Sequence, residues 1–133
     1  MGKPCVLVVE DEENIQTTLS VVLTLEGFTA LTASNVDEAL AILGREQVDA
    51  VSLDIRMPDP QGLERDGLTL LKLLRATPQY KAVPVLLFTG VELKADEDAM
   101  VEELGAKLFY KPQLYAEIIE ELHRSLTAHP PAA

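Results

Sequence analysis

The chain has 133 residues, 47% of them hydrophobic, which suits a single domain with a buried core. Its 22 acidic residues outnumber its 11 basic ones and give a formal net charge of −11, which argues against nucleic acid or an anionic membrane surface as a direct partner, because phosphate groups need a surplus of Lys and Arg. No apolar run approaches the ~20 residues that span a bilayer.

The first predicted element is a strand over residues 5–9 (CVLVV), which ends in acids and so does not have the form of a signal peptide. It contains the single cysteine, Cys5, which cannot form an internal disulfide. We interpret Cys5 as a small apolar residue and not as a reactive thiol. These features predict a reducing, cytoplasmic location.

Further short apolar runs alternate with helical patterns along the rest of the chain. The runs that predict strands lie at 28–33, 49–53, 83–88 and 107–110. Apolar side chains recur at helical spacing between and after these runs, at Ile15–Leu23, after Asn35, at Leu68–Leu74, at Ala99–Leu104 and at Leu114–Leu126. Asn35 with Glu38 is typical of a capping box, and Gly105 predicts the end of the fourth helix.

Strand and helix repeated five times predict an α/β domain, a doubly wound (βα)5 sandwich of three layers with a parallel five-stranded sheet. The runs 5–9, 49–53 and 83–88 are continuously apolar, as in strands covered on both faces. The run 28–33 mixes in threonines and suits an edge. We therefore expect the strand order 2-1-3-4-5. The expected domain covers 1–127, followed by a short tail over 128–133.

Polar residues follow four of the predicted strands, at the edge where sites form in such sheets. Glu10 and Asp11 follow the first strand and Asp54 the third, while Thr89 and Lys111 follow the fourth and fifth. Carboxylates that converge repel each other unless a cation joins them, and hard oxygen ligands favour Mg²⁺. A metal, a lysine and a hydroxyl around one carboxylate predict a phosphoryl site with Asp54 as the nucleophile.

Each of these residues taken alone has a simpler interpretation. Asp54 alone is typical of a turn or a helix cap, and Glu10 to Glu13 alone are typical of a solvated first helical turn. Thr89 alone is a turn residue and Lys111 a surface charge. The functional interpretation depends on their joint placement. His123 and His129 lie on or after the last helix, and we interpret them as exposed polar residues, not metal ligands.

The segments VLVVEDE, LDIRMP, LLFTG and YKP, in that order, resemble the receiver domain of bacterial response regulators over about residues 5 to 127. The resemblance implies that Asp54 accepts a phosphoryl group from a histidine of a sensor kinase or a phosphotransfer protein. It implies Mg²⁺ held by Glu10, Asp11, Asp54 and the backbone carbonyl of Arg56. It also implies that Thr89 and Lys111 contact the phosphoryl group, and that the Lys111–Pro112 bond is cis.

Two departures from the family pattern leave alternatives open. The glycine expected after Met57-Pro58 is either Gly62, at the usual spacing, or Gly67, about five residues late, so the loop carries an insertion around 59–66. Family members often have a switch aromatic three residues before the lysine, and this position holds Leu108 here. Phe109 or Tyr110 could take over the role, or the switch could be muted, and core packing is the favoured interpretation of Phe109.

We therefore expect a phosphorylation-controlled switch that passes its signal to a downstream protein, not a conventional enzyme, with autophosphatase activity left open. The chain resembles a single-domain regulator, although a fragment of a longer one would look the same. The last helix is open to a role in a homodimer. The alternative function is a degenerate receiver that serves as a phosphorylation-independent docking module. A haloacid-dehalogenase-type phosphatase is disfavoured because Arg56 stands where a second carboxylate is needed.

Overall fold

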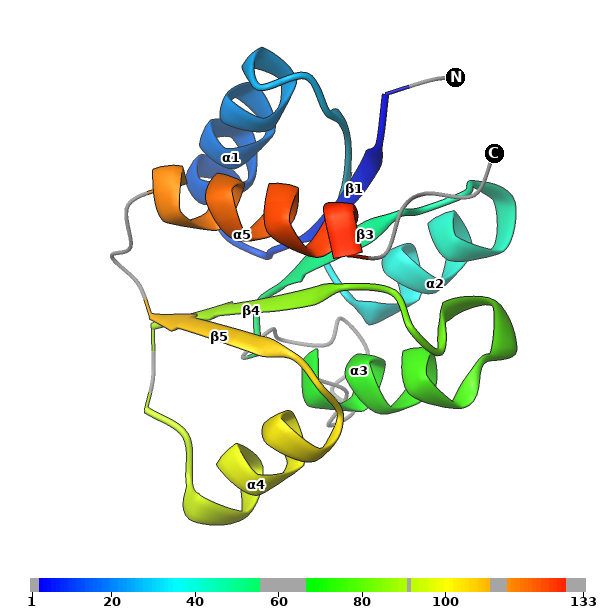
Figure 1. The fold of residues 1–133 in the computed structure, drawn as a ribbon, viewed down its shortest axis with the longest axis vertical. Helices are drawn as coiled ribbons and strands as arrows, with labels where there is room; N and C mark the ends of the chain where they lie inside the picture. The colour runs from blue at the N-terminus through cyan, green and yellow to red at the C-terminus, as the bar shows by residue number, and fades with distance from the viewer. Residues whose placement is uncertain (1–2, 56–66, 91, 111–114, 129–133) are drawn as a thin grey trace.

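The computed structural model describes residues 3–55, 67–90, 92–110 and 115–128. Strands and helices alternate along the chain, as predicted (Figure 1). The strands are β1 (Cys5–Val9), β2 (Thr29–Ala33), β3 (Ala50–Leu53), β4 (Val85–Thr89) and β5 (Lys107–Tyr110). The helices are α1 (Glu13–Leu25), α2 (Val36–Arg45), α3 (Gly67–Ala76), α4 (Ala95–Glu103) and α5 (Tyr115–Ala128), with a 3-10 turn, η1 (Pro78–Tyr80), that the sequence did not predict.

The five strands form one parallel sheet in the order β2-β1-β3-β4-β5, which confirms the predicted topology. β3 and β4 are buried along their whole length and β1 at all but its first residue. The two edge strands are partly exposed, as the threonines of β2 indicated. Such continuously apolar central strands need a helix layer on each face of the sheet.

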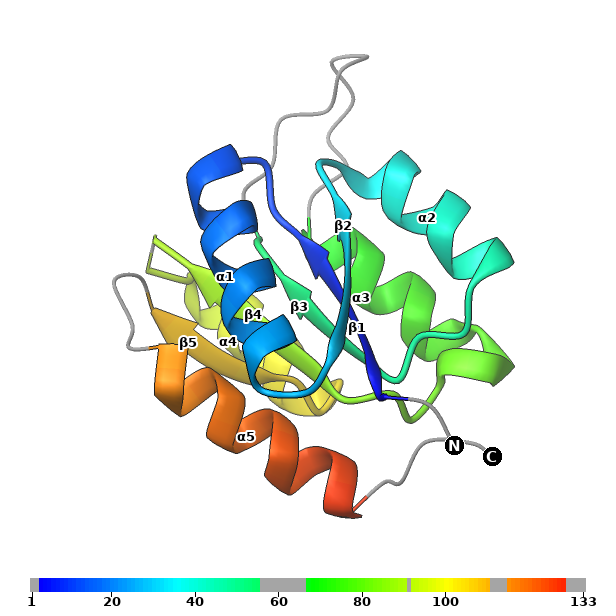
Figure 2. The same ribbon diagram turned by 90° about the horizontal axis from the view of Figure 1, so that it is seen from above.

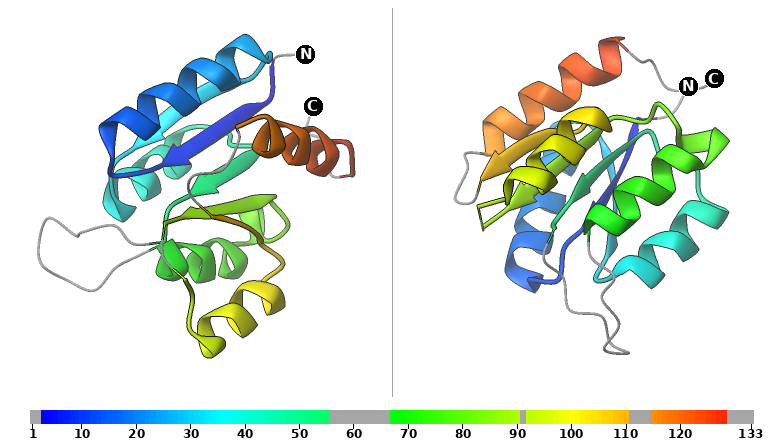
Figure 3. Two further views of the ribbon diagram at one scale, coloured as in Figure 1. Left: turned by 90° about the vertical axis from the view of Figure 1, so that its left-hand side faces the viewer. Right: turned by 90° about the horizontal axis from the view of Figure 1, so that it is seen from below.

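The two helix layers each enclose a separate hydrophobic core. One core joins α1 and α5 to the sheet, and the other joins α2, α3 and α4 to the opposite face. Figure 2 shows α1 and α5 on one side of the strands, and Figure 3 shows α3 and α4 in front of the sheet when it is seen from below. No helix in the described part of the chain is long and apolar enough to cross a membrane.

Two strand boundaries differ from the sequence prediction for identifiable reasons. Phe28 precedes β2 because its backbone N–H donates to the Leu23 carbonyl of α1 at 3.0 Å, so the pairing with β1 begins at Thr29. Its ring is buried in the core beneath α1 and α5, 5.0 Å from the ring of His123. The fourth strand begins at Val85 and not at 83, since Pro84 has no N–H to donate to a neighbouring strand. It extends through Thr89, which the sequence placed just after the strand.

Cys5 has a structural environment, in agreement with its interpretation as a packing residue. Its backbone N–H donates to the Asp49 carboxylate at 2.7 Å, which ties the start of β1 to the start of β3. Burial, together with the nearby charges of Asp49 and Glu46, raises the pKa of the Cys5 thiol above its ordinary value. A thiol that stays protonated is a poor nucleophile.

Arg75, near the end of α3, joins three segments at the amino end of the sheet. Its Nε donates to the Leu104 carbonyl at 2.7 Å, just after α4, and its Nη1 donates to the Val83 carbonyl at 2.7 Å, just before β4. Three backbone segments are thereby held by one guanidinium, because its donors form a rigid fork.

The predicted cap of α2 tests how the sequence sets a helix start. The Asn35 side chain accepts from the Glu38 N–H at 2.9 Å, and the Glu38 carboxylate accepts from the Ser34 N–H at 3.0 Å. Replacing Asn35 by Ala should lower the free energy of unfolding by about 1 kcal/mol, because a helix N–H loses its acceptor. Urea denaturation measures the change.

Asn14→Ala is the matched control, since Asn14 is exposed in the first turn of α1 and its side chain makes no hydrogen bond with the residues that the structure describes. This control should unfold close to the parent midpoint. Equal effects of the two substitutions would show that the Asn35 cap contributes nothing.

Candidate functional site

Two buried carboxylates follow neighbouring strands at the same edge of the sheet. Val9 pairs with Leu53 in the β1–β3 register, so Glu10 and Asp54 come next on the two strands. The Asp54 N–H donates to the Val9 carbonyl at 2.9 Å, and the Glu10 N–H donates to the Ala33 carbonyl at 2.9 Å. Glu10 is 3% exposed and Asp54 4% exposed. The sheet therefore brings these two side chains to adjacent positions at its carboxyl edge.

A cluster of three carboxylates follows β1. Glu10, Asp11 and Glu12 have carboxylate oxygens that all lie within 4.8 Å of one another, with Glu10 buried and the other two exposed. Three carboxylates at this separation repel each other, and an all-oxygen set of this kind suits a hard divalent cation. Within the described residues Asp54 is outside this closest group, although it follows the neighbouring strand.

Glu12 is the member of this cluster that sequence reasoning did not assign to the site. It occupies the N-cap position of α1, and its carbonyl accepts the Gln16 N–H at 2.9 Å. The run of four acids was visible in the sequence, but the pattern does not say which of them remain beside Glu10 and which belong only to the helix. The extended backbone of Glu12, before α1 begins, keeps it in the cluster.

Gln16 is a second residue that the sequence gave no reason to select. Its side-chain amide donates to the carbonyl of Glu10 at 3.0 Å and to the carbonyl of Ala33 at 3.2 Å. It thus joins the first turns of α1 to the ends of β1 and β2. A glutamine on a helix has no distinctive spacing, so only the fold shows this role.

Thr89 is the last residue of β4, the strand next to β3, and is 0% exposed. Thr89 thus lies at the sheet's carboxyl edge, inside the strand that the sequence expected it to follow. In the β4–β5 register Thr89 lies opposite Tyr110, which is 42% exposed. Because alternate residues of a strand share a face, Tyr110 and Leu108 face one side of the sheet and Phe109 the other.

The three candidates for the switch aromatic differ in their surroundings. Phe109 is half-buried against the core beneath α1 and α5, as its favoured interpretation expected. Leu108 is half-buried against the core on the α2, α3 and α4 side. Tyr110 alone among them is an exposed aromatic next to Thr89.

Gly67 supports the backbone of Asp54 from the start of α3. Its N–H donates to the Ile55 carbonyl at 2.9 Å, and a Cβ at this position would overlap the carbonyl oxygen of Asp54. Gly67, one of the two glycines that the sequence left open, therefore packs against the backbone of Asp54. Gly62 lies outside the described residues.

Several predicted site features fall in segments that the structure does not describe. These are Lys111, the Lys111–Pro112 bond, the Arg56 carbonyl and the insertion around 59–66. The described residues thus bring together Glu10, Asp11, Asp54 and Thr89 from the tips of β1, β3 and β4.

Comparison with known proteins finds the same sequence pattern elsewhere. A model of the response regulator receiver domain matches residues 6–123. An NtrX-like response regulator of Rickettsia bellii is 40% identical over 85 residues, which are 64% of this chain and 17% of that protein. The DNA-binding transcriptional regulator NtrC of Proteus hauseri is 33% identical over 130 residues, 96% of this chain and 25% of that protein. The chain thus spans a quarter or less of the length of these two relatives.

The fold is similar to that of the chemotaxis protein CheY4 of Vibrio cholerae. The two structures superpose with a TM-score of 0.82 at 28% identity, over 94% of this chain and 100% of the other.

The contact between Gly67 and Asp54 leads to a prediction about stability. Gly67→Ala should destabilise the fold by about 1–3 kcal/mol, because the added methyl group must displace the Asp54 backbone or α3. The measurement is urea denaturation, with the Asp54 amide followed by NMR as a local reporter.

Gly44→Ala is the matched control, since Gly44 lies within α2 and a Cβ there has nothing within 4 Å. Alanine is more favourable than glycine in a helix interior, so Gly44→Ala should leave the free energy of unfolding unchanged or raise it by up to about 1 kcal/mol. If Gly67→Ala behaved in the same way, the close approach to Asp54 would not constrain the fold.

Proposed function

Because the chain belongs to the response regulator receiver domain family, we propose that Asp54 accepts a phosphoryl group from a phosphohistidine of a sensor kinase or a phosphotransfer protein. The observation that carries this proposal is the placement of Asp54 at the tip of a buried strand, beside Glu10 and next to the strand that ends in Thr89. The same proposal includes a domain over 1–127 that acts in the cytoplasm.

The transfer is a displacement at phosphorus. A carboxylate oxygen of Asp54 forms the new P–O bond while the P–N bond to the donor histidine breaks. The electron pair of the P–N bond returns to the imidazole, which takes up a proton, and Asp54 becomes an acyl phosphate. The protein's contribution is to position the carboxylate and to offset charge.

The donor set at the tip of β1 fits Mg²⁺, because it offers carboxylate oxygens close together, with Glu10 buried and Asp11 and Glu12 exposed. We propose Glu10, Asp11 and Asp54 as ligands together with the carbonyl of Arg56, and Glu12 as a further carboxylate beside them. When bound, the ion would neutralise the acids and offset the negative charge of the phosphoryl group. Glu10 and Asp11 would fix its place, and Gln16 would hold the backbone of Glu10 in position.

Thr89 and Lys111 would stabilise the phosphorylated form. The Thr89 hydroxyl, at the end of β4, donates a hydrogen bond to a phosphoryl oxygen once it turns toward Asp54. The Lys111 ammonium pairs with the phosphate charge. Tyr110 lies opposite Thr89 in the register, and we propose it as the aromatic that reports the movement of Thr89 to a downstream protein.

The rival function is a phosphorylation-independent docking module, and one assay distinguishes the two. Incubation of the protein with Mg²⁺ and acetyl phosphate, followed by intact mass spectrometry, should show the gain of one phosphoryl group. The gain should be absent in Asp54→Asn and strongly reduced when a chelator removes Mg²⁺. No gain in the parent protein would favour the docking module, and turnover of the donor without an adduct would favour a hydrolase.

The ligand assignment gives a separate prediction. Asp11→Asn should weaken Mg²⁺ binding by roughly tenfold or more, because the site loses one charged oxygen ligand. Isothermal titration calorimetry measures this affinity directly. Glu103→Gln is the control, since it removes the same charge from the exposed end of α4. Equal losses in both variants would assign the effect to overall charge and contradict the proposed ligand.

A further inference from the structure

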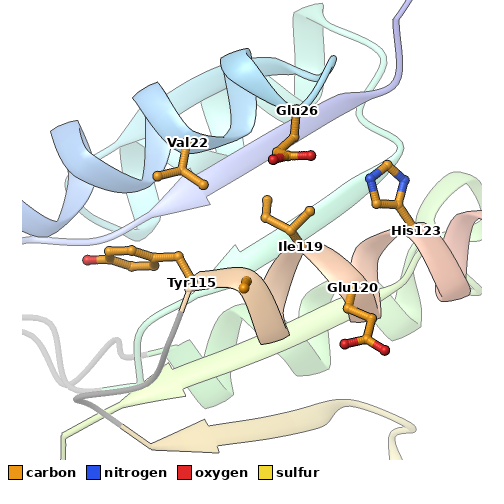
Figure 4. Close-up of a pocket in the computed structure, with 7 residues that line it drawn as sticks. Val22, Glu26, Tyr115, Ile119, Glu120 and His123 are labelled. Atoms are coloured by element: carbon orange, nitrogen blue, oxygen red, sulfur yellow. The ribbon is translucent and has the colours of Figure 1, made fainter.

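A groove runs between α1 and α5 on the face of the sheet that these two helices cover (Figure 4). It has a volume of about 560 Å³ and is open to solvent along its length. The residues that line it are Val22 of α1 and Glu26, which caps the end of α1, with Tyr115, Ala116, Ile119, Glu120 and His123 of α5.

The groove exists because the largest side chains of both helices point into the sheet and not toward each other. Leu19 and Leu23 of α1, and Ile118 and Leu122 of α5, are buried in the core beneath. Ala116 is too small to close the space that remains between the helices. The floor is therefore apolar, with Val22 and Ile119 on opposite sides, as Figure 4 shows.

Aromatic rings stand at both ends of the groove. The Tyr115 ring lies 6.2 Å from the ring of Phe88, and the His123 ring lies 5.0 Å from the ring of Phe28. Phe88 and Phe28 belong to the core beneath α1 and α5. The ends are thus anchored to the sheet, which makes the groove a preformed feature of the fold.

Acidic side chains stand along the rim. Glu26 lies on the α1 side and Glu120 on the α5 side. Arg124 lies 3.6 Å from the Glu120 carboxylate, but its shorter contact, at 2.6 Å, is to Glu121. An exposed ion pair of this length contributes little free energy, so a competing cation can displace Arg124 from Glu120. The rim therefore attracts cations on both sides of an apolar floor.

We propose that this groove docks an amphipathic cationic helix of a partner protein, with apolar side chains in the groove and Lys or Arg side chains beside Glu26 and Glu120. Helices recognise such grooves through apolar residues at i, i+3 or i+4 and i+7. A second copy of this chain is disfavoured, because it would bring like charges together on a chain of net charge −11. The groove lies apart from Asp54, so the proposal does not depend on phosphorylation.

The probe is a labelled synthetic helix with leucines on one face and lysines on the other, and binding is measured by fluorescence anisotropy. The expected result is saturable binding, with amide NMR shifts centred on Val22, Ile119 and His123. A peptide with glutamates in place of the lysines should bind far more weakly. A peptide with serines in place of the leucines should also lose binding, because the groove floor is apolar.

Paired charge reversals test the site. Glu26→Lys with Glu120→Lys should weaken binding by roughly tenfold or more, since both rim charges change sign. Folding should be retained, because Glu26 is exposed at the end of α1, where a cation is favoured, and Glu120 is exposed on α5. The matched control, Glu102→Lys with Glu103→Lys on α4, makes the same change in net charge and should bind like the parent.

Ala116→Trp is a second, independent variant that fills the groove without altering charge. It should abolish binding while its unfolding midpoint stays near that of the parent. The proposal is overturned if the lysine peptide does not bind, if both charge-reversed pairs bind alike, or if the NMR shifts map elsewhere. Sedimentation showing that the parent self-associates through these residues would overturn it in favour of a dimer interface.

Discussion

The backbone pairing between β1 and β3 is the constraint on which the candidate site depends. The Asp54 N–H bonded to the Val9 carbonyl fixes where the third strand ends relative to the first, and this sets Glu10 beside Asp54. Two carboxylates that are nearly buried would be costly in an arbitrary place, because charge is poorly solvated there. Here they stand where apolar strands have already ended, and Asp11 and Glu12 continue the cluster into solvent. Packing in the core thus determines where β1 and β3 end, and the ends of these strands determine where the carboxylates lie.

Periodicity and strand ends predicted the sheet order, the five helices and the positions of Glu10, Asp54 and Thr89, because each depends on a local pattern that the fold repeats. The sequence could not predict contacts that depend on the route of the chain in space. Gln16 bonds to the carbonyls of two strand ends, and η1 places the buried Tyr80 hydroxyl 2.9 Å from the Leu43 carbonyl. The contact of Gly67 with the backbone of Asp54 likewise depends on the route of the chain in space. None of these contacts follows from a residue spacing that could be recognised in the sequence.

The division of the core into two clusters separates two chemical environments on one small domain. The carboxyl edge of the sheet gathers acids from the ends of β1 and β3, and its character is polar. The seam between α1 and α5 is apolar at its floor, because the large side chains of both helices are committed to the sheet. A chain of this size can therefore present a polar site and an apolar groove without either one disturbing the packing that supports the other.

Arg75 has a consequence for how α4 can be displaced. Its bonds to the carbonyls of Leu104 and Val83 hold the carboxyl end of α4 to α3 and to the entry of β4. Val101 is the fully buried residue of α4, and Met100 and Leu104 pack against the same core near the helix's carboxyl end. A displacement of α4 that keeps the guanidinium bonds would leave its Leu104 end in place. The amplitude is then greatest at Ala95, the end of the helix that follows Thr89 along the chain.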